Sequence, residues 1–415
     1  MRLTADTRPL RLPAYRRLWI AGTVTAVGGQ LTIVAVPKQL YDLGGSSAYI
    51  GISGLVSFLA LAASALWGGS LADVVDRRRL LLLTSSGIAI TSVLLWAHAV
   101  LRVDSVALLL VLVAAQAAFV GAHLPALGAA VPRVVPPELI PAASSLSHLS
   151  RYTGWITGPL LAGALLPLIG LGWLYLLDAV ALCAIVWAVL RLPPIPPGEA
   201  AARRPDLRHL LDGVRYLAGH RVLLAVLAAD LGAMVFGMPV ALFPEVARER
   251  FGDPPSGGIV LGLLYASYPA GVVAMGLLSA TITRATRYGA MVTVAVLLWG
   301  LTVVGFGLSH QLWMALAFFA AGGAANFVLS TFRNAFTQTA AADELLGRTQ
   351  GLVAVITMGG PTLGVFLHGT VGAALGTTWA VSGGGVLVVL TMLATVAAVP
   401  DFWRYRRASP ATVGR

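Results

Sequence analysis

The feature that most constrains the fold is a series of long apolar runs, separated by short polar segments, along the whole chain. A helix that crosses a lipid bilayer needs about 20 mainly apolar residues, and many runs of this length are present. Only 11% of the 415 residues are charged, whereas about 25% are charged in an ordinary soluble domain. This much apolar surface cannot be hidden inside one water-soluble core, so the sequence predicts an all-α membrane protein.

The apolar runs divide the chain into twelve predicted transmembrane helices. Their approximate bounds are 18–37, 48–71, 80–101, 106–131, 142–166, 171–190, 222–243, 258–282, 290–308, 312–332, 350–374 and 379–398. The longest hydrophilic stretch, residues 191–221, is a predicted cytoplasmic linker with a Pro-rich segment and a short amphipathic helix over 207–217. It separates an N-terminal six-helix bundle, residues 1–190, from a C-terminal six-helix bundle with a cytoplasmic tail, residues 222–415.

The placement of basic residues predicts how the chain is oriented in the membrane. Most of them lie in segments on the same side as the N-terminus, and the opposite loops hold Lys38, Arg102, Arg248 and Arg250. Because positive residues are enriched in cytoplasmic loops, we expect a multi-pass protein of the plasma membrane with both termini in the cytoplasm. The net charge of +11 reflects these short loops, so no nucleic-acid partner is expected.

An internal repeat relates the two halves of the chain. Gly51 and Gly69 recur, with the same spacing and about half a chain later, as Gly258 and Gly276. A Gly-Pro pair in the fifth predicted helix also recurs in the eleventh. Repeats of this kind are typical of transporters in which two six-helix bundles face each other across a central cavity. The sequence therefore predicts two similar bundles.

A charged turn separates the second predicted helix from the third. Its three consecutive arginines, residues 77–79, suit a short cytoplasmic turn, but that role does not explain Asp73. The position that matches Asp73 in the second half is Ala280, so the acid is expected to act in the first half alone. It is predicted to form a latch by capping the N-terminus of another helix, a contact worth about 0.3–2 kcal/mol. An ordinary polar turn is the alternative.

Two motifs resemble those of the major facilitator superfamily. The turn resembles the signature between helices 2 and 3, carried here by Gly69, Asp73, Arg77 and Arg78. The fifth helix resembles the motif of the superfamily's exporters, carried here by Gly154, Gly158, Pro159 and Gly163. Val74 and Asp76 depart from the turn signature. Longer segments, such as VAVPKQLYDLGGSSAYIG and DELLGRTQGL, are similar to the enterobactin-exporter-like branch of the multidrug and siderophore efflux transporters.

This resemblance covers nearly the whole chain and implies the major facilitator fold, with 12 transmembrane helices in two pseudo-symmetric bundles. It implies a secondary active transporter that exports a small amphipathic molecule, a drug or a siderophore, by proton-driven alternating access. It also points to the eleventh helix as the acceptor of the Asp73 latch. The alternative is an importer or a lipid flippase on the same fold, although the exporter motif argues against import.

Three ionisable side chains lie inside predicted helices, where a charge costs about 2.5–3.5 kcal/mol on insertion scales. Asp230 is the candidate for proton coupling, with a substrate contact or a structural hydrogen bond as alternatives. Arg151 and Asp178 are predicted first to form a structural ion pair. The alternative for Arg151 is contact with an anionic substrate, for which a catecholate siderophore is suited.

Several neutral or weakly basic side chains inside the predicted helices are further candidates. His148 lies one turn before Arg151, and either a proton relay or simple packing would account for it. Gln30 and Asn326 are candidates for neutral polar contacts that line the cavity. Trp155 is a candidate contact for an aromatic substrate.

Other functional classes lack the residues that they require. An ATP-driven pump needs a Gly-rich loop that ends in Lys-Ser or Lys-Thr, but the only lysine, Lys38, is followed by Gln39. No metal-ligand spacing or nucleophile–base set is found, so we expect neither an enzyme nor a cofactor or metal. The expected partners are a small-molecule substrate, the proton and the lipid bilayer, and the resemblance implies a monomer.

Overall fold

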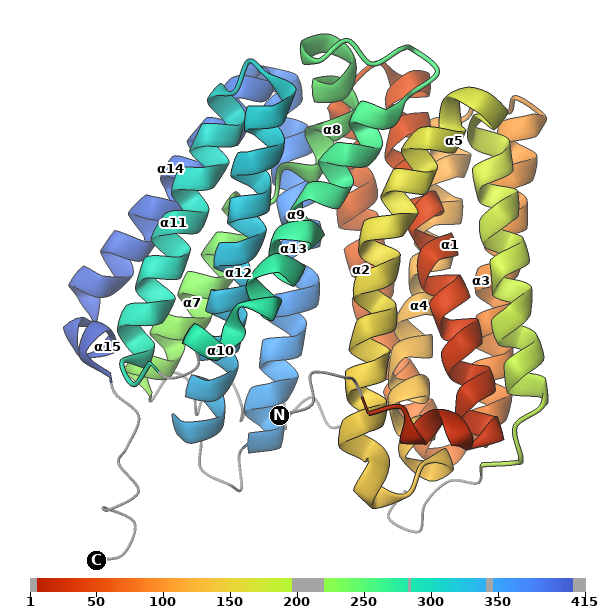
Figure 1. Cartoon of the computed structure of the whole chain (residues 1–415). Helices are drawn as coiled ribbons and strands as arrows, with labels where there is room; N and C mark the ends of the chain where they lie inside the picture. Colours follow the sequence, from red (N-terminus) through yellow and green to blue (C-terminus); the bar gives the residue numbers. More distant parts are fainter. Residues whose placement is uncertain (1–5, 196–219, 283–284, 341–345, 406–415) are drawn as a thin grey trace, which may run out of the picture. The chain divides into compact units, whose positions relative to one another are not determined.

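A computed structural model describes residues 6–195, 220–282, 285–340 and 346–405. Within these ranges, no side chain is described for residues 66–74, 129, 280–281, 338–340, 346–356 and 358. The described residues form helices and no strands (Figure 1). Ten of these helices are long and apolar enough to cross a membrane, so the prediction of an all-α membrane protein is confirmed.

The chain forms two compact units. Unit 1 contains Met1–Pro205 and Pro244–Ala266, and unit 2 contains Asp206–Phe243 and Ser267–Arg415. Unit 1 therefore includes a short segment from the second half of the chain. The amphipathic helix predicted over 207–217 lies outside the described residues.

Unit 1 is built from five long helices and several short ones. They are η1 (Arg8–Arg11), α1 (Pro13–Gly44), α2 (Ser47–Val74), α3 (Arg77–Val100), α4 (Val106–Val134), η2 (Pro137–Leu139), α5 (Ile140–Leu190), the π-helix η4 (Val246–Arg250) and the first part of α9 (Ile259–Leu277). α5 contains both the fifth and the sixth predicted helices. The chain turns between them at Gly170, whose φ of 80° is unfavourable for side chains with a Cβ.

The first helix packs closely on the first half of α5 (Figure 1). Three side chains of α1 form hydrogen bonds with α5. The Tyr15 hydroxyl donates to the Ala143 carbonyl at 2.8 Å, and the Trp19 indole donates to the Leu146 carbonyl at 2.9 Å. One turn further on, the Thr23 and Ser150 hydroxyls are 2.6 Å apart. These bonds fix the register of the two helices.

Unit 2 contains the corresponding helices of the second half. They are α7 (Arg221–Phe236), η3 (Pro239–Leu242), the end of α9, α10 (Ser279–Ile282), α11 (Tyr288–Leu308), α12 (Leu312–Ala340), α13 (Leu346–Leu375), α14 (Thr377–Ala398) and α15 (Pro400–Arg404), and the short α8 (Phe243–Glu245) lies at the boundary. α13 packs on α7, and a Cβ added at Gly360 would lie only 2.7 Å from the Met234 Cβ. The pairing repeats that of α5 on α1, as the internal repeat predicts.

The core of unit 2 is aromatic. Trp299 of α11 is fully buried, and its indole donates to the Ala233 carbonyl of α7 at 3.1 Å. Its ring lies 5.4 Å from that of Tyr268 and 6.3 Å from that of Phe319. Such ring pairs add to the apolar burial that holds helices together.

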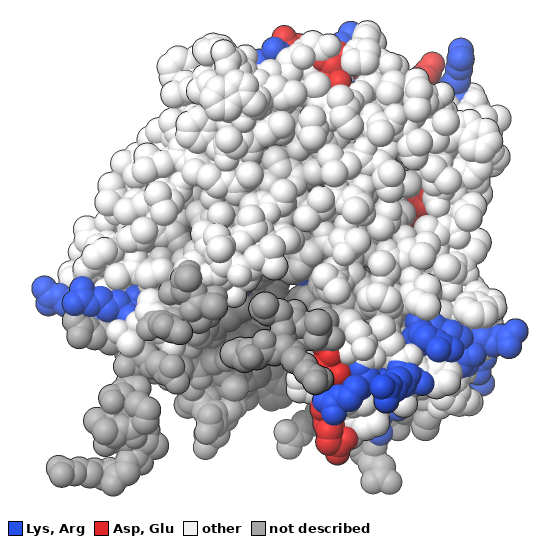
Figure 2. All heavy atoms as spheres, viewed as in Figure 1, with Lys and Arg blue, Asp and Glu red and all other residues white. Residues whose placement is uncertain are grey.

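The charged side chains lie mainly near the ends of the helices. Figure 2 shows mostly uncharged atoms along the helix sides, with Lys and Arg atoms concentrated near the ends. One boundary differs from the prediction and affects the site. The tenth predicted helix ends at residue 332, whereas α12 continues to Ala340 and includes Arg333.

Candidate functional site

A polar stripe runs along one face of α5, at a depth where a membrane helix is normally apolar. It consists of His148, Arg151, Tyr152 and Trp155, whose spacing places them on one side of a helix. The Arg151 guanidinium donates to His148 Nδ1 at 2.6 Å, and its central carbon lies 6.0 Å from the Trp155 ring centroid. The Trp155 ring meets that of Tyr152 edge to face at 5.7 Å. We call this group the Arg151 stripe.

The Arg151 side chain is exposed. Among the described residues, no acidic side chain forms a salt bridge with it. Arg151 lies about 16 Å along the helix from the start of α5 at Ile140. Because a guanidinium stays charged in proteins, it requires water or an anion here. A fork of donors beside aromatic rings can bind an anionic aromatic group.

The predicted ion pair between Arg151 and Asp178 is wrong. Both residues belong to α5, on opposite sides of the turn at Gly170. Arg151 is about 11 residues farther from that turn than Asp178, which corresponds to about 16 Å along the helices. The sequence alone gives the depth of each residue only from the nearer end of its own helix, so it did not reveal this separation. Each residue has other partners.

Asp178 lies at the centre of a polar cluster within unit 1 and is 1% exposed. Its Oδ2 accepts hydrogen bonds from the Thr32 hydroxyl of α1 at 2.7 Å and the Ser92 hydroxyl of α3 at 2.9 Å. The Gln116 amide of α4 donates to the Ser92 hydroxyl at 3.1 Å. The second oxygen, Oδ1, has no hydrogen-bond partner among the described residues. The cluster therefore joins four helices through uncharged donors.

The other buried aspartate, Asp230 of α7, forms an ion pair within unit 2. Its Oδ2 accepts from Arg333 Nη1 of α12 at 2.6 Å, and the two residues are 0% and 5% exposed. Arg333 also donates to the neighbouring Asn334 Oδ1, through Nε at 3.3 Å and Nη2 at 3.2 Å. This partner was missed because the predicted helix stopped before Arg333. The apolar Ala335 and Phe336 that follow it were the available signal.

The exporter motif packs against two helices of unit 1. A Cβ added at Gly154 would lie 2.6 Å from the Ala26 carbonyl oxygen of α1. On the other side, a Cβ at Gly163 would lie 2.8 Å from the Gly262 Cα of α9. Close backbone approach of this kind requires glycine. The motif therefore joins α1 and α9 through α5.

Two further motif residues take part in these contacts. A Cβ at Gly158 would lie 2.4 Å from the Cβ of Gln30, so this candidate cavity residue packs half-buried against the motif. The Pro159 carbonyl oxygen would lie 2.5 Å from a Cβ at Gly262. Pro159 leaves α5 without one backbone donor, and its own carbonyl faces the α9 backbone.

In the charged turn, Asp76 fixes the start of α3. Its Oδ1 accepts from the Arg79 amide at 3.1 Å, and its Oδ2 accepts from the Ile195 amide at 3.0 Å. The Arg77 amide donates to the Ile195 carbonyl at 3.0 Å, and the Arg78 guanidinium donates to the Leu190 carbonyl at 2.7 Å. The residue that departs from the signature is thus the N-cap of α3.

Two residues of the predicted latch, Gly69 and Asp73, lie near the end of α2. No side chain is described for residues 66–74, so the Asp73 latch stays a prediction. Asn326, a predicted cavity residue, is buried in unit 2, where its Oδ1 accepts from the Ser330 hydroxyl at 3.3 Å. Its amide nitrogen has no partner among the described residues.

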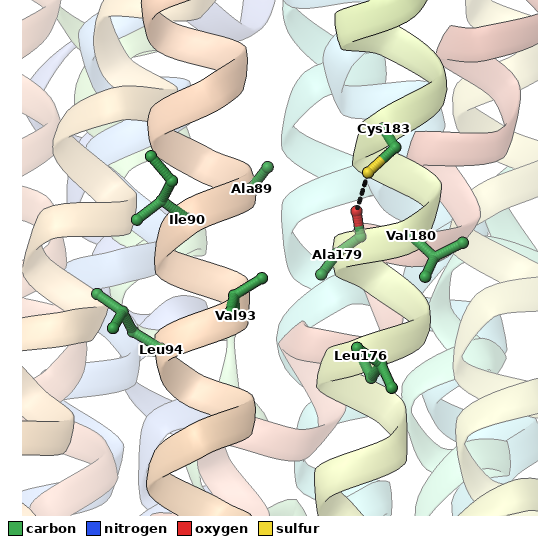
Figure 3. A pocket seen from close by; sticks show the side chains of 8 residues that line it. All are labelled: Ala89, Ile90, Val93, Leu94, Leu176, Ala179, Val180 and Cys183. Carbon is green, nitrogen blue, oxygen red and sulfur yellow. Dashed lines mark hydrogen bonds between the residues drawn. The ribbon is translucent and has the colours of Figure 1, made fainter.

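A shallow groove lies between α3 and the second half of α5 (Figure 3). It is lined by Ala89, Ile90, Val93, Leu94, Leu176, Ala179, Val180 and Cys183. The exposed Cys183 thiol donates to the Ala179 carbonyl at 3.4 Å, the contact dashed in Figure 3. The other lining side chains are aliphatic, so the groove suits hydrocarbon and lacks groups that would orient a polar molecule.

The fold and these sites define a membrane transporter built from two repeated helical halves. Residues 4–409 match the transmembrane secretion effector family, and the chain therefore belongs to this family of the major facilitator superfamily. The enterobactin exporter of Citrobacter koseri is 27% identical over 403 residues, which cover 97% of this chain and 95% of that protein. The enterobactin exporter of Shigella boydii serotype 18 is also 27% identical, with coverage of 96% and 94%.

Solved structures share the fold at lower identity. A bacterial homologue of the human lysosomal transporter Spinster is 15% identical, with a TM-score of 0.72 and coverage of 97% of this chain and 100% of that one. A POT family transporter in complex with 5-aminolevulinic acid is 14% identical, with a TM-score of 0.73 and coverage of 94% and 96%. The predicted fold class and superfamily are thus confirmed, and the protein is a multi-pass membrane transporter of small molecules.

Proposed function

We propose that this transporter exports a small amphipathic molecule, and that the Arg151 stripe is part of its binding site. The observation that carries the proposal is the exposed Arg151 guanidinium, which forms no salt bridge with any acidic side chain of the described residues and lies beside the Trp155 ring. A charge in this position is stable only where it faces water or an anion. The substrate class that fits is an anionic aromatic molecule, such as a catecholate siderophore.

The relatives and the exporter motif support export rather than import. The curated relatives are enterobactin exporters, and enterobactin-like catecholates carry the ring and acidic groups that the stripe would bind. The glycines of the motif allow α5 to approach both α1 and α9 closely, which suits a surface that seals in one state of alternating access.

Asp230 is our candidate for proton coupling. The Asp230 carboxylate forms an ion pair with Arg333. A proton can replace Arg333 at the carboxylate only if the guanidinium finds another partner, such as water in an opened cavity. Protonation would remove the charge that holds α7 to α12 and would thereby link proton uptake to helix movement. His148 remains a candidate relay or substrate contact, because it accepts a hydrogen bond from Arg151.

The proposed setting is the plasma membrane, with both termini in the cytoplasm and the protein acting as a monomer. The support for this orientation is the concentration of arginines in segments on the N-terminal side. The end of unit 1 at which α1 begins would then face the cytoplasm, and the end at which α1 finishes would face outward.

Inside-out vesicles with an imposed pH gradient test the proposal. Catecholates, macrolides and fluorescent cations would be offered in parallel to the wild type, to Arg151→Gln and to Arg133→Gln, a control that removes an exposed arginine of α4. Loss of a charged hydrogen-bond pair should slow catecholate uptake about ten-fold or more in Arg151→Gln and leave cations unaffected. Equal catecholate rates in all three proteins would exclude the stripe as the binding site.

The direction and the energy source are tested in the same vesicles. Uptake that requires the pH gradient and disappears in Asp230→Asn would support proton-driven export. Release of preloaded compound from these vesicles would point to the importer alternative, and transport of labelled lipid in place of the soluble compounds would point to the flippase alternative.

A further inference from the structure

The side of α3 that borders the groove of Figure 3 stays exposed as far as the start of the helix. Ile90 lines the groove and is exposed. Leu83 and Arg79, which are also exposed, precede it by seven and eleven residues. Both spacings are close to whole numbers of turns at 3.6 residues per turn. The three side chains therefore follow one line along α3, and the charged one stands at its end.

The second half of α5 carries a line with the same spacing. Val180 lines the groove and is exposed. The exposed Trp187 and Arg191 follow it by seven and eleven residues. Arg191 comes directly after the last residue of α5, and its guanidinium carbon lies 5.9 Å from the Trp187 ring centroid. On both helices, an apolar line therefore leads from the groove to an arginine.

The two arginines lie at the same end of unit 1. The Arg78 guanidinium of α3 donates to the Leu190 carbonyl of α5 at 2.7 Å. Arg79 and Arg191 each directly follow one of these two residues. The ends of the two lines therefore lie close together, and we call Arg79, Leu83, Trp187 and Arg191 the α3–α5 seam.

The described acidic side chains leave both charges of the seam without a salt bridge. The acid beside them, Asp76, already accepts from two backbone amides, those of Arg79 and Ile195. The Arg79 and Arg191 guanidiniums are exposed, so an external anion can reach them. Phosphate oxygens suit this arrangement, because a guanidinium can donate two parallel hydrogen bonds to them.

The length of the seam matches one leaflet of a bilayer. Eleven residues of helix rise about 16 Å, and one leaflet contributes about 15 Å to the hydrocarbon core. With the two arginines at the level of the lipid phosphates, the groove would lie near the middle of the membrane, where acyl chains end. Trp187 would then lie near the interface, where tryptophan is enriched in membrane proteins.

One class of ligand matches the arginines and the apolar lines together. A small soluble anion would leave the apolar lines and the groove unused. A neutral lipid would leave the two guanidiniums without a counter-charge. An anionic phospholipid offers a phosphate to the arginines and a hydrocarbon chain to the groove, whose lining side chains are aliphatic apart from Cys183.

We propose that the α3–α5 seam binds one anionic phospholipid. The phosphate lies between Arg79 and Arg191, and one acyl chain runs past Leu83 and Trp187 into the groove at Cys183. The bound lipid joins α3 to α5 from outside the bundle. Its site is separate from the Arg151 stripe, and the proposal does not depend on which molecule is transported.

Binding to the delipidated, detergent-purified protein is the first test. Native mass spectrometry would follow the one-lipid complex during titration with dioleoyl phosphatidylglycerol or dioleoyl phosphatidylcholine. Because each basic residue near the surface favours an anionic lipid, phosphatidylglycerol should bind about ten-fold or more tightly. Equal affinity for the two lipids would overturn the proposal. Displacement of the lipid by glycerol phosphate would also overturn it, because the arginines would then form a site for free phosphate.

A pair of substitutions locates the headgroup. Arg79→Gln/Arg191→Gln should lower the affinity for phosphatidylglycerol about ten-fold or more. Arg11→Gln/Arg16→Gln is the matched control, because it removes two exposed arginines near the start of α1 and changes the net charge equally. It should leave the affinity unchanged. Arg79→Lys/Arg191→Lys keeps both charges and should retain most of the preference for phosphatidylglycerol. Unchanged affinity in the Gln pair would overturn the proposal.

A third comparison locates the acyl chain. Cys183→Trp fills the groove and should weaken the binding of phosphatidylglycerol about three-fold. The loss is small because the chain finds similarly apolar surroundings in the detergent micelle. Leu177→Trp, at an exposed position of α5 outside the groove lining, should leave the affinity unchanged. Equal affinities in the two Trp variants would overturn the placement of the chain. These measurements involve no transport, so their failure would leave the proposed export untouched.

Discussion

Two aspartates are equally buried in the two units, yet they are stabilised in different ways. Asp178 in unit 1 and Asp230 in unit 2 are 1% and 0% exposed, and each has one oxygen without a partner among the described residues. Asp178 is bound by hydroxyl groups, whereas Asp230 is bound by a guanidinium. Burial alone therefore does not identify a coupling residue. What distinguishes Asp230 is that its charge holds a second, opposite charge in place.

The largest effect is expected from Asp230→Asn. The substitution leaves Arg333 charged, buried and without its acidic partner, which typically costs about 3–5 kcal/mol. We expect a matching fall in the free energy of unfolding and loss of gradient-driven export. Thermal unfolding of the detergent-purified protein and vesicle transport measure the two effects.

The double variant Asp230→Asn/Arg333→Gln is the matched control for that experiment. It removes both charges, so most of the lost stability should return, because no unpaired charge remains. Export should stay absent if Asp230 carries the proton. Recovery of gradient-driven export in the double variant would show that the pair is structural. Asp230 would then differ from Asp178 only in how its carboxyl group is stabilised.

A smaller effect is expected from Asp178→Asn. The amide oxygen can still accept from Thr32 and Ser92, and no opposite charge is left behind. The new NH₂ group would occupy the position of the unpartnered Oδ1 and lack an acceptor there, which costs about 1–3 kcal/mol. Unfolding experiments on both aspartate variants compare the two sites directly. If the free energy of unfolding fell as much in Asp178→Asn as in Asp230→Asn, Asp178 would have to hold an ionic partner as Asp230 does.

The sequence predicted the architecture better than the contacts. The apolar runs, the repeat and the two motifs were enough to predict the membrane helices and the superfamily, both of which are confirmed. Hydropathy also singled out Asp178 and Asp230 as unusual. It could not pair them, because position along a helix gives depth but neither the direction of a side chain nor the neighbouring helix.

The residues that were missed share a physical reason. Arg333 and Lys38 lie at the edges of apolar runs, where a charge is readily assigned to a loop. Arg333 is instead inside α12, and Lys38 is buried within α1. A buried acid requires a partner, so Asp230 was, besides Ala335 and Phe336, a second clue to a buried cation. No comparable signal in the sequence connects Lys38 with the Pro255 carbonyl, to which its amine donates at 2.7 Å, since that contact depends on how the loop between η4 and α9 folds.

The smallest effect is expected from Gln116→Leu, which tests how the hydrogen bonds around Asp178 stabilise unit 1. Gln116 does not touch Asp178, but it donates to the Ser92 hydroxyl that binds the carboxyl group. Removing one neutral hydrogen bond should lower the free energy of unfolding by about 0.5–1.5 kcal/mol. Ser92→Ala removes both bonds and should cost more. If the two variants were equally destabilised, the bond between Ser92 and Asp178 would contribute little, and Asp178 would depend mainly on Thr32.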